Sequence, residues 1–436
     1  MSLNDVQTNH GTSGTTTSRA TDLISYEDLY ARWEQGNWSA MELDFSEDAR
    51  QWREEMTEFE RTAALWNYAL FFWGEDAVAD NLSPYIDAAP LEEQKYFLTT
   101  QQVDEARHAI FFKRFMHEVC GIGDGTMAGG LGAIEPQLTW GFRRTFERLD
   151  TIADELRADR SLPKLSAAVT LYHMVVEATL AQPGQHFITN YLEKRDMLPA
   201  FRAGMEQIAR DEQRHIAFGV KLLADVASGD ERCRRAVADV LREVTPWGPA
   251  VLQPPGWDRN YTEAFGFTLE EIAEESIGSL QTKLRSAGMP MDELPGPPIV
   301  PVGLTNREQA ERGYKLVQIG LLGEKLGPPS REPEAIELVM DTLRRQLPDT
   351  NGTSLTVQLA FSDVDPWLLR LGGGMPRAER GSERKPDVTL ACSWEDWVDV
   401  AAGRLDPRRA LLSRRLRPKA RLSALRLLPA VLGGRG

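Results

Sequence analysis

The sequence predicts a mainly helical protein with a four-helix-bundle core and extra helices, followed by a small C-terminal α+β domain. Three observations support this prediction. Apolar residues recur at helical spacing from Tyr26 to about residue 287, where strand-like alternation is scarce. The pentapeptide Asp-Glu-x-Arg-His occurs twice within this pattern, at 104–108 and 211–215. Beyond Gly327 the pattern changes to short strand candidates at 355–361 and 388–392.

These patterns divide the chain into four regions. Residues 1–24 are rich in Thr, Ser, Gly and Asn, and we expect them to be disordered. Residues 25–290 form the helical domain, and residues 291–330 form a proline-rich linker with a helix at 306–326. Residues 331–436 form the appended domain, with helices at 333–346 and from Trp394 to Gly403.

The expected helices of the helical domain follow its apolar stripes. They lie near 46–86, 91–120, 132–158, 163–194, 197–228, 230–245 and 268–287. The glycine-rich stretch 121–133 is expected to be a loop.

Composition narrows the class of protein. The net charge is −15, and residues 331–436 carry a net +4, so the acidic main body argues against nucleic-acid binding. The longest apolar run, 65–73, is too short for an integral membrane segment. A polar N-terminus and three scattered cysteines indicate a cytoplasmic protein with reduced thiols. Nine Lys/Arg and no acid follow Asp406, which fits a solvated basic face or contact with anionic lipid headgroups.

Each pentapeptide places a glutamate and a histidine three residues apart, on the same side of a helix. The pairs are Glu105 with His108 and Glu212 with His215. Both pairs lie at the centre of mainly apolar stripes, and a buried carboxylate needs a partner cation or a metal. Arg107 and Arg214 could supply cations, but at two residues from each glutamate they face away from the stripe. The spacing therefore favours a metal site over buried ion pairs.

Two further glutamates complete a set known from four-helix di-metal proteins. Glu75 and Glu177 are each the single acid on an apolar stripe, and each lies upstream of one pentapeptide. Four carboxylates and two imidazoles suit two first-row metals, iron or manganese, better than structural zinc. The expected ligands are Glu75, Glu105 and His108 for one metal and Glu177, Glu212 and His215 for the other, with Glu105 as a bridge.

Other polar residues close to these positions are candidates for supporting roles. Asp104 and Asp211 precede the ligands and could accept the second N–H of a histidine across the bundle, although both could also be surface residues. Gln101 lies one turn before Glu105 and could tune the metals. Phe112, one turn after the first pentapeptide, cannot form a tyrosyl radical.

Residues 45–285 resemble the ribonucleotide reductase small-subunit superfamily of ferritin-like di-metal carboxylate proteins. Within it they most resemble the ligand-binding oxidases. The matching stretches are 74–78, 104–108, 169–172 leading into Glu177, and 211–219. The resemblance implies a ferritin-like fold, a Mn/Fe or Fe/Fe centre and a long-chain fatty acid bound at the metals. It also implies an ether cross-link between Val78 and Tyr172.

The position of Tyr172 tests this implication. Tyr172 lies five residues before Glu177, about 140° away from the metal-facing side of a straight α-helix. It reaches the metals only if the helix widens locally, as π-bulges do. In a regular helix His173 points inward instead, as a rival ligand or supporting residue.

The appended domain resembles sterol carrier protein type 2-like domains over residues 331–433. The resemblance rests on the stretch 394–407, an arginine-rich segment and a final apolar helix. It implies an apolar tunnel for lipids or acyl chains, and the alternative is an oligomerisation domain with an ordinary core.

Together these features predict a metal-dependent oxidoreductase, of the O₂-dependent oxidase or monooxygenase type, that acts on a C–H bond of a lipid-like ligand. We expect two metal ions per chain and a homodimer. One alternative is a reductase small subunit without a tyrosyl radical, and another is a metal-storage or lipid-carrier protein. The residues alone do not distinguish between external substrates or between the two metal pairs. They also leave two tasks for the appended domain, which are delivery of substrate and assembly.

Overall fold

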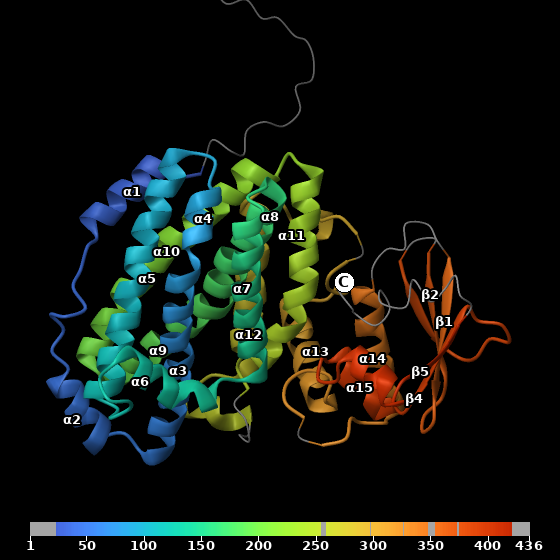
Figure 1. Cartoon of the computed structure of the whole chain (residues 1–436). Helices are drawn as coiled ribbons and strands as arrows, with labels where there is room; N and C mark the ends of the chain where they lie inside the picture. The colour runs from blue at the N-terminus through green and yellow to red at the C-terminus, as the bar shows by residue number, and fades with distance from the viewer. Residues whose placement is uncertain are drawn as a thin grey trace, which may run out of the picture.

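A computed structural model describes residues 23–253, 259–296, 298–325, 327–347, 354–372 and 375–420. It shows a large helical body beside a smaller sheet domain, which confirms the predicted fold class (Figure 1). The expected disorder of the first residues and the expected final helix fall on 1–22 and 421–436, outside the described residues.

The helical body extends from α1 to α13. Its α-helices are α1 (Tyr26–Gln35), α2 (Ser46–Glu54), α3 (Glu58–Asn81), α4 (Ser83–Ala88), α5 (Glu92–Glu118), α6 (Met127–Ile134), α7 (Trp140–Ala158), α8 (Leu162–Val169), α9 (Gln182–Arg195), α10 (Pro199–Ala227), α11 (Glu231–Val244), α12 (Leu269–Ser286) and α13 (Asn306–Ile319). A π-helix, η3 (Thr170–Ala181), joins α8 to α9, and a 3-10 helix, η4 (Thr245–Ala250), follows α11.

Four of these elements form the core of the bundle. Helix α3 packs on α5, and α10 packs on both α5 and η3. Figure 1 shows α3, α5 and α10 side by side within the body. The largest buried side chains of this region are aromatic, and Phe115 packs on Phe201 with ring centroids 4.1 Å apart. The long helices thus provide rigid supports with an apolar interior.

Helix starts explain where the expected helices were too long. The expected helix 46–86 consists of α2, α3 and α4, because Thr57 begins α3 with a capping box. Its side chain accepts from the Glu60 amide at 3.2 Å, and its own amide donates to Glu60 Oε2 at 2.8 Å. Pro84 then opens α4. These caps interrupt an apolar pattern that reads as continuous.

Two expectations around residue 130 were wrong for a similar reason. The expected loop 121–133 contains α6, which Thr126 caps by accepting from the Gly129 amide at 3.0 Å. The expected helix 132–158 begins only at Trp140, where Thr139 accepts from the Phe142 amide at 3.2 Å. Threonine side chains that satisfy free backbone amides outweigh the glycine content here.

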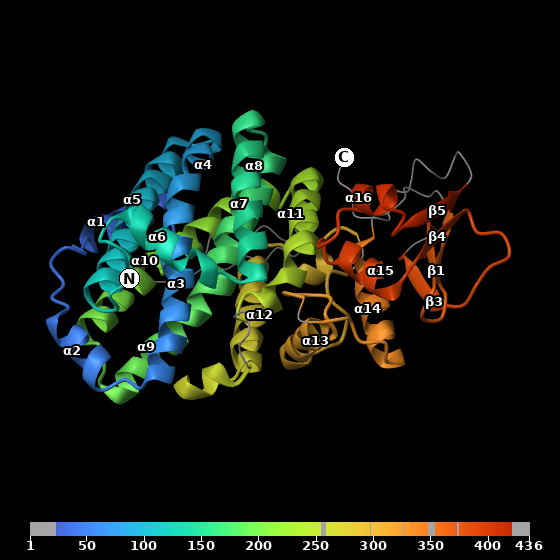
Figure 2. The ribbon, with the colours of Figure 1, turned by 60° about the horizontal axis from the view of Figure 1, so that its bottom comes forward.

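The appended domain contains a mixed sheet covered by helices (Figure 2). Its strands are β1 (Leu355–Phe361), β2 (Trp367–Leu371), β3 (Arg377–Arg380), β4 (Val388–Cys392) and β5 (Arg417–Ala420), and its helices are α14 (Pro333–Gln346), α15 (Trp394–Ala401) and α16 (Pro407–Leu412). The strand order is β3-β2-β1-β4-β5, with β1 parallel to β4 and the other pairs antiparallel. Strands β1 and β4 have the predicted bounds, and β2, β3 and β5 were not predicted.

The end of α13 and the segment after it join the helical body to the appended domain. Leu316, Leu321 and Leu322 belong to the same apolar core as the sheet. Lys325 pairs with Asp399 of α15 at 2.7 Å. The expected helix 306–326 was too long, because α13 stops at Gly320, whose φ of 94° is readily adopted only by glycine.

Within the described part of the chain, the helices are either too short or too polar to cross a membrane.

Candidate metal centre

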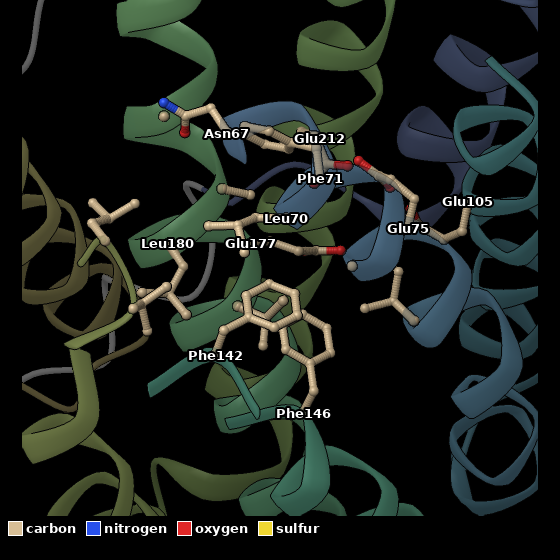
Figure 3. A pocket seen from close by; sticks show the side chains of 17 residues that line it. Asn67, Leu70, Phe71, Glu75, Glu105, Phe142, Phe146, Glu177, Leu180 and Glu212 are labelled. Carbon is tan, nitrogen blue, oxygen red and sulfur yellow. The ribbon is translucent and has the colours of Figure 1, made fainter. Parts of the chain in front are cut away.

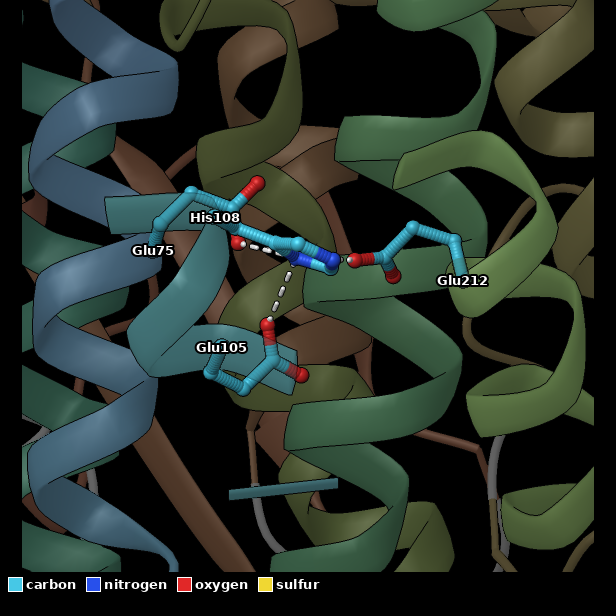
Figure 4. Close-up of side chains that lie close together, drawn as sticks. All are labelled: Glu75, Glu105, His108 and Glu212. Carbon is cyan, nitrogen blue, oxygen red and sulfur yellow. Dashed lines mark hydrogen bonds and ion pairs between the residues drawn. The ribbon is translucent and has the colours of Figure 1, made fainter. Parts of the chain in front are cut away.

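Six acid and imidazole side chains converge inside the bundle. They come from four elements: Glu75 from α3, Glu105 and His108 from α5, Glu177 from η3, and Glu212 and His215 from α10. Each is between 0% and 6% exposed. Their ligand atoms form two groups, within each of which all atoms lie within 4.8 Å of one another, and Glu105 belongs to both. Figure 4 shows the first group, in which Glu75, Glu105 and Glu212 surround the imidazole of His108.

The Nδ1 atoms of the two histidines face this centre. His108 Nδ1 lies 3.2 Å from Glu75 Oε2 and 3.3 Å from Glu105 Oε2. His215 Nδ1 lies 3.1 Å from Glu105 Oε1 and 3.7 Å from Glu177 Oε1. Glu105 therefore lies between the two imidazoles, where a bridging ligand would be placed.

Glu212 differs from its expected grouping. It groups with Glu75, Glu105 and His108 and not with Glu177 and His215. Its Oε1 lies 3.6 Å from His108 Nδ1 and 3.9 Å from His215 Nδ1. Because the carboxylate points between the histidines, spacing along α10 could not assign it to one metal.

The polar atoms of the site fit a pair of metal ions. Among the described residues, two buried carboxylate oxygens of the expected ligands, Glu177 Oε2 and Glu212 Oε2, have no hydrogen-bond partner. A buried polar atom without a partner costs free energy, which metal coordination would recover. Oxygen and imidazole donors in this number match di-iron and related di-metal carboxylate centres.

Burial and mutual charge shift the pKa values of these groups in different directions. Burial raises the pKa of Glu75 to about 7, against the attraction of His108. Burial also raises the pKa of Glu177 and of Glu212 well above their usual range. Burial also acts to raise the pKa of Glu105, but attraction to the two imidazoles outweighs it and holds this pKa well below its usual range.

The imidazoles of His108 and His215 are both protonated at neutral pH. Burial acts to lower the pKa of both imidazoles, and neighbouring carboxylates outweigh it, led by Glu75 for His108 and by Glu105 for His215. The pKa values of both histidines are therefore raised well above the ordinary value. The site holds protons that metal ligation would displace.

Asp104 and Asp211 contact the far nitrogen of the histidines crosswise. His215 Nε2 lies 3.1 Å from Asp104 Oδ2, and His108 Nε2 lies 3.1 Å from Asp211 Oδ2. Each aspartate belongs to the pentapeptide of the other helix. This is the geometry that an orienting role requires, because it leaves each Nδ1 facing the centre.

Two tryptophans that the sequence did not single out, together with Arg214, hold these two aspartates. Trp33 Nε1 donates to Asp104 at 2.9 Å, and Trp38 Nε1 donates to Asp211 at 2.8 Å. Arg214 bridges the pair, with a nitrogen 3.2 Å from Asp104 and 2.5 Å from Asp211. Arg214 thus faces away from the apolar stripe that carries Glu212 and His215, as expected. Its positive charge offsets the charges of Asp104 and Asp211.

The π-helix η3 brings Tyr172 to the centre. In a π-helix the hydrogen bonds run between residues five apart, so Tyr172 and Glu177 lie on successive turns. Tyr172 Oη donates to Glu105 Oε1 at 2.8 Å. Burial raises the pKa of Tyr172 well above its usual range, so the phenol keeps its proton.

His173 lies outside both ligand groups, unlike the rival ligand considered for a regular helix. Its Nε2 lies 3.2 Å from Gln101 Oε1. Burial lowers the pKa of His173 to about 3, so the ring is neutral. Gln101 in turn donates to Glu177 at 2.8 Å and to Tyr172 at 3.1 Å. Gln101 therefore connects a supporting histidine to two residues of the centre.

An apolar pocket of about 70 Å³ opens on the carboxylates. Figure 3 shows Glu75, Glu177 and Glu212 pointing into it. The opposite walls are apolar and include Leu70, Val78, Phe142, Phe146, Val176 and Leu180. Such a pocket suits an apolar ligand whose polar end lies at the metal ligands.

The fold and the site define a di-metal carboxylate protein. Residues 24–245 match the family described as ribonucleotide reductase, small chain, and the protein belongs to that family. Residues 336–419 match the SCP-2 sterol transfer family, which confirms the predicted resemblance of the appended domain.

Solved structures share the helical fold. The R2-like ligand-binding oxidase from Sulfolobus acidocaldarius is 23% identical, with a TM-score of 0.51 over 65% of this chain and 93% of its own. A glycine-to-phenylalanine variant of an R2-like ligand-binding oxidase, with an anaerobically reconstituted Mn/Fe cofactor, is 25% identical. It has a TM-score of 0.52 over 60% of this chain and 93% of its own.

Proposed function

We propose that the protein is an O₂-dependent oxidase or monooxygenase that uses a Mn/Fe or Fe/Fe pair to oxidise a C–H bond of an apolar ligand, such as a long-chain fatty acid. The observation that carries this proposal is the pocket whose apolar walls end on four carboxylates of the metal-ligand set. When bound, the two metals would supply the activation of O₂. The matched oxidases with a Mn/Fe cofactor support the first of these two metal pairs.

The pocket residues would bind and orient the ligand. Phe142 and Phe146 stack with ring centroids 4.2 Å apart and form one apolar wall. Leu70 and Val176 line the pocket beside the carboxylates. A ligand carboxylate would lie towards the metals and its chain along these walls, which exclude water from the reacting C–H bond.

We propose Val78 as an internal target of the same chemistry. Val78 lies one turn after Glu75 on α3 and lines the pocket. Tyr172, hydrogen-bonded to Glu105, would be its partner. In the cross-link, a C–H bond of Val78 and the O–H bond of Tyr172 break and a C–O bond forms. The two hydrogens and their electrons pass to O₂.

Intact mass and metal analysis test this proposal. The apoprotein is loaded anaerobically with Fe(II) and Mn(II), and its mass is compared before and after exposure to air. We expect O₂ consumption and a loss of two hydrogens that maps to peptides with Val78 and Tyr172. Tyr172→Phe is the matched control and should bind metals without the mass loss. Metal-loaded protein that consumes no O₂ would contradict the oxidase proposal.

A radical-generating reductase subunit is the second candidate, because the family match favours it. Phe112 occupies the position expected for a radical tyrosine and stacks on Phe71 with ring centroids 5.8 Å apart. Such a subunit would therefore need to use the metal centre itself as oxidant. Stable capture of a large reductase subunit, with ribonucleotide reduction by the complex, would favour this function.

A further inference from the structure

A second cavity, of about 180 Å³, lies between the helical body and the appended domain. Its walls come from η3, α11, η4, α12 and α13, and from α14 of the appended domain. Figure 2 shows α13 and α14 between α12 and the sheet. The apolar part includes Val175, Ile277, Leu280, Met291 and Leu316. The family match ends at residue 245, so most of this wall lies beyond it.

The charged residues of this lining are all cations. Arg242, Arg312 and Arg345 line the cavity, and the described lining includes no Asp or Glu. Arg312 and Arg345 share one carboxylate outside the lining, Asp341, at 2.7 and 3.2 Å. Arg344 uses the same carboxylate at 2.5 Å. One acid thus serves three guanidinium groups, which leaves a local excess of positive charge.

Burial makes this excess costly. Arg312 is one-fifth exposed and Arg345 less, at 21% and 14% of their side chains. Burial lowers the pKa of Arg312, which reflects the cost of holding its charge away from water. A bound anion would offset that cost with charge-assisted hydrogen bonds. A hydroxyl of the lining, Thr245 Oγ1, is also buried without a hydrogen-bond partner among the described residues.

We propose that this cavity is a second binding site, for an amphiphile with an anionic head and a long acyl chain. The head, a carboxylate or a phosphate monoester, lies at Arg312 and Arg345. The chain lies over Ile277 and Leu280. The alternative occupant is residues 421–436 of the same chain. This segment carries three arginines and no acid, so repulsion from the arginines of the lining disfavours it.

The cavity also adjoins the pocket at the metal centre. Leu180 and Leu252 line both spaces. A chain bound in the second cavity would therefore end close to the pocket that the metal ligands line. The binding site itself does not depend on the oxidase proposal, because none of the expected metal ligands lines it.

Photo-cross-linking of the full-length, metal-loaded protein tests the site. The probe is palmitic acid with a mid-chain diazirine, and labelled peptides are mapped by mass spectrometry. We expect labels in α12 or α13, within 269–286 or 306–319. Ile277→Trp, which fills the cavity, should remove these labels and keep the thermal transition. Labels confined to the metal pocket or to the sheet domain would overturn the proposal, as would labels unchanged by Ile277→Trp.

A matched pair of arginine variants tests the head group. Arg345→Gln should weaken the binding of palmitate and of hexadecyl phosphate roughly tenfold, and leave hexadecanol unchanged. Arg344→Gln is the control, because Arg344 pairs with the same Asp341 but does not line the cavity. The preferred anion identifies the head as carboxylate or phosphate. Equal losses of affinity in both variants, or equal binding of hexadecanol and palmitate in the native protein, would refute the proposed position of the head group. Both readouts are independent of O₂ consumption, so this proposal and the oxidase proposal can fail separately.

Discussion

Asp104→Asn is expected to weaken one metal position through a histidine of another helix. The substitution keeps the size of the side chain and removes the charge that faces His215 Nε2 at 3.1 Å. His215 would then lose the partner that orients its ring, although it keeps its place on α10. The expected effect is therefore on metal affinity at the position that His215 serves.

The contacts of Asp104 set the size of this effect. Besides His215, the carboxylate accepts from Trp33 at 2.9 Å, from Arg107 at 2.9 Å and from Arg214 at 3.2 Å, and it is 1% exposed. The remaining donors would still hold an asparagine in place. Loss of a partner that orients a ligating histidine typically costs roughly 10- to 100-fold in metal affinity. This corresponds to about 1.4–2.7 kcal/mol at one metal position.

A double-mutant cycle separates this route from general damage to the fold. Anaerobic equilibrium dialysis against Mn(II), followed by metal analysis, would give the affinity of each variant. If Asp104 acts through His215, Asp104→Asn adds little to His215→Ala and keeps its full effect in His108→Ala. Equal effects in both backgrounds, or native affinity for Asp104→Asn alone, would refute the crosswise arrangement. Thermal transitions of the apoproteins control for loss of structure.

Three further predictions follow from the packing and charge of the centre. With the pKa of Glu75 at about 7 and those of both imidazoles raised, metal loading at pH 7 should release more than two protons per chain. Metal affinity should accordingly fall as pH falls from 8 to 6, and a pH-stat titration with each metal checks both results. Gly219→Ala should lower stability by about 1–3 kcal/mol. Its new Cβ would lie 2.3 Å from His173 Cβ, whereas Gly229→Ala meets nothing within 4 Å and should leave the thermal transition unchanged. Ala181→Phe, which narrows the pocket, should weaken fatty-acid binding while metal content, measured in parallel, stays at the native level.

The proposed metal ligands could be predicted because each lies on an element whose pattern is local. A glutamate and a histidine three residues apart must share a helix face, and Glu75 is the single acid on its apolar stripe. Local spacing was therefore enough to predict these side chains, and no contact between distant segments had to be known. Strands β1 and β4 were predictable for the same reason, since their buried residues alternate along one short segment.

Contacts between distant segments could not be predicted in this way. Trp38 donates to Asp211, 173 residues further along the chain, and Trp33 donates to Asp104, 71 residues away. A tryptophan that packs and a tryptophan that donates to a buried carboxylate look the same in sequence. Strands β3 and β5 are largely exposed, so they lack the alternating burial that reveals a strand. Arg214 was placed correctly as facing away, but its two aspartate partners were not evident.

The π-helix brings Tyr172, and not His173, to the centre. A glycine on α10 leaves the space that this arrangement requires. The wide turn of the π-helix places His173 against α10, where a Cβ at Gly219 would lie 2.5 Å from the Cγ of the ring. Helix α10 therefore has room for this histidine only because residue 219 has no side chain. Thr179 Oγ1 supports the wide turn by donating to the Met174 carbonyl, five residues back, at 2.6 Å. If a regular α-helix were restored, His173 would leave this space and Tyr172 would lose Glu105. The glycine thus supports the π-helical register, and with it the tyrosine at the centre of the proposed cross-link.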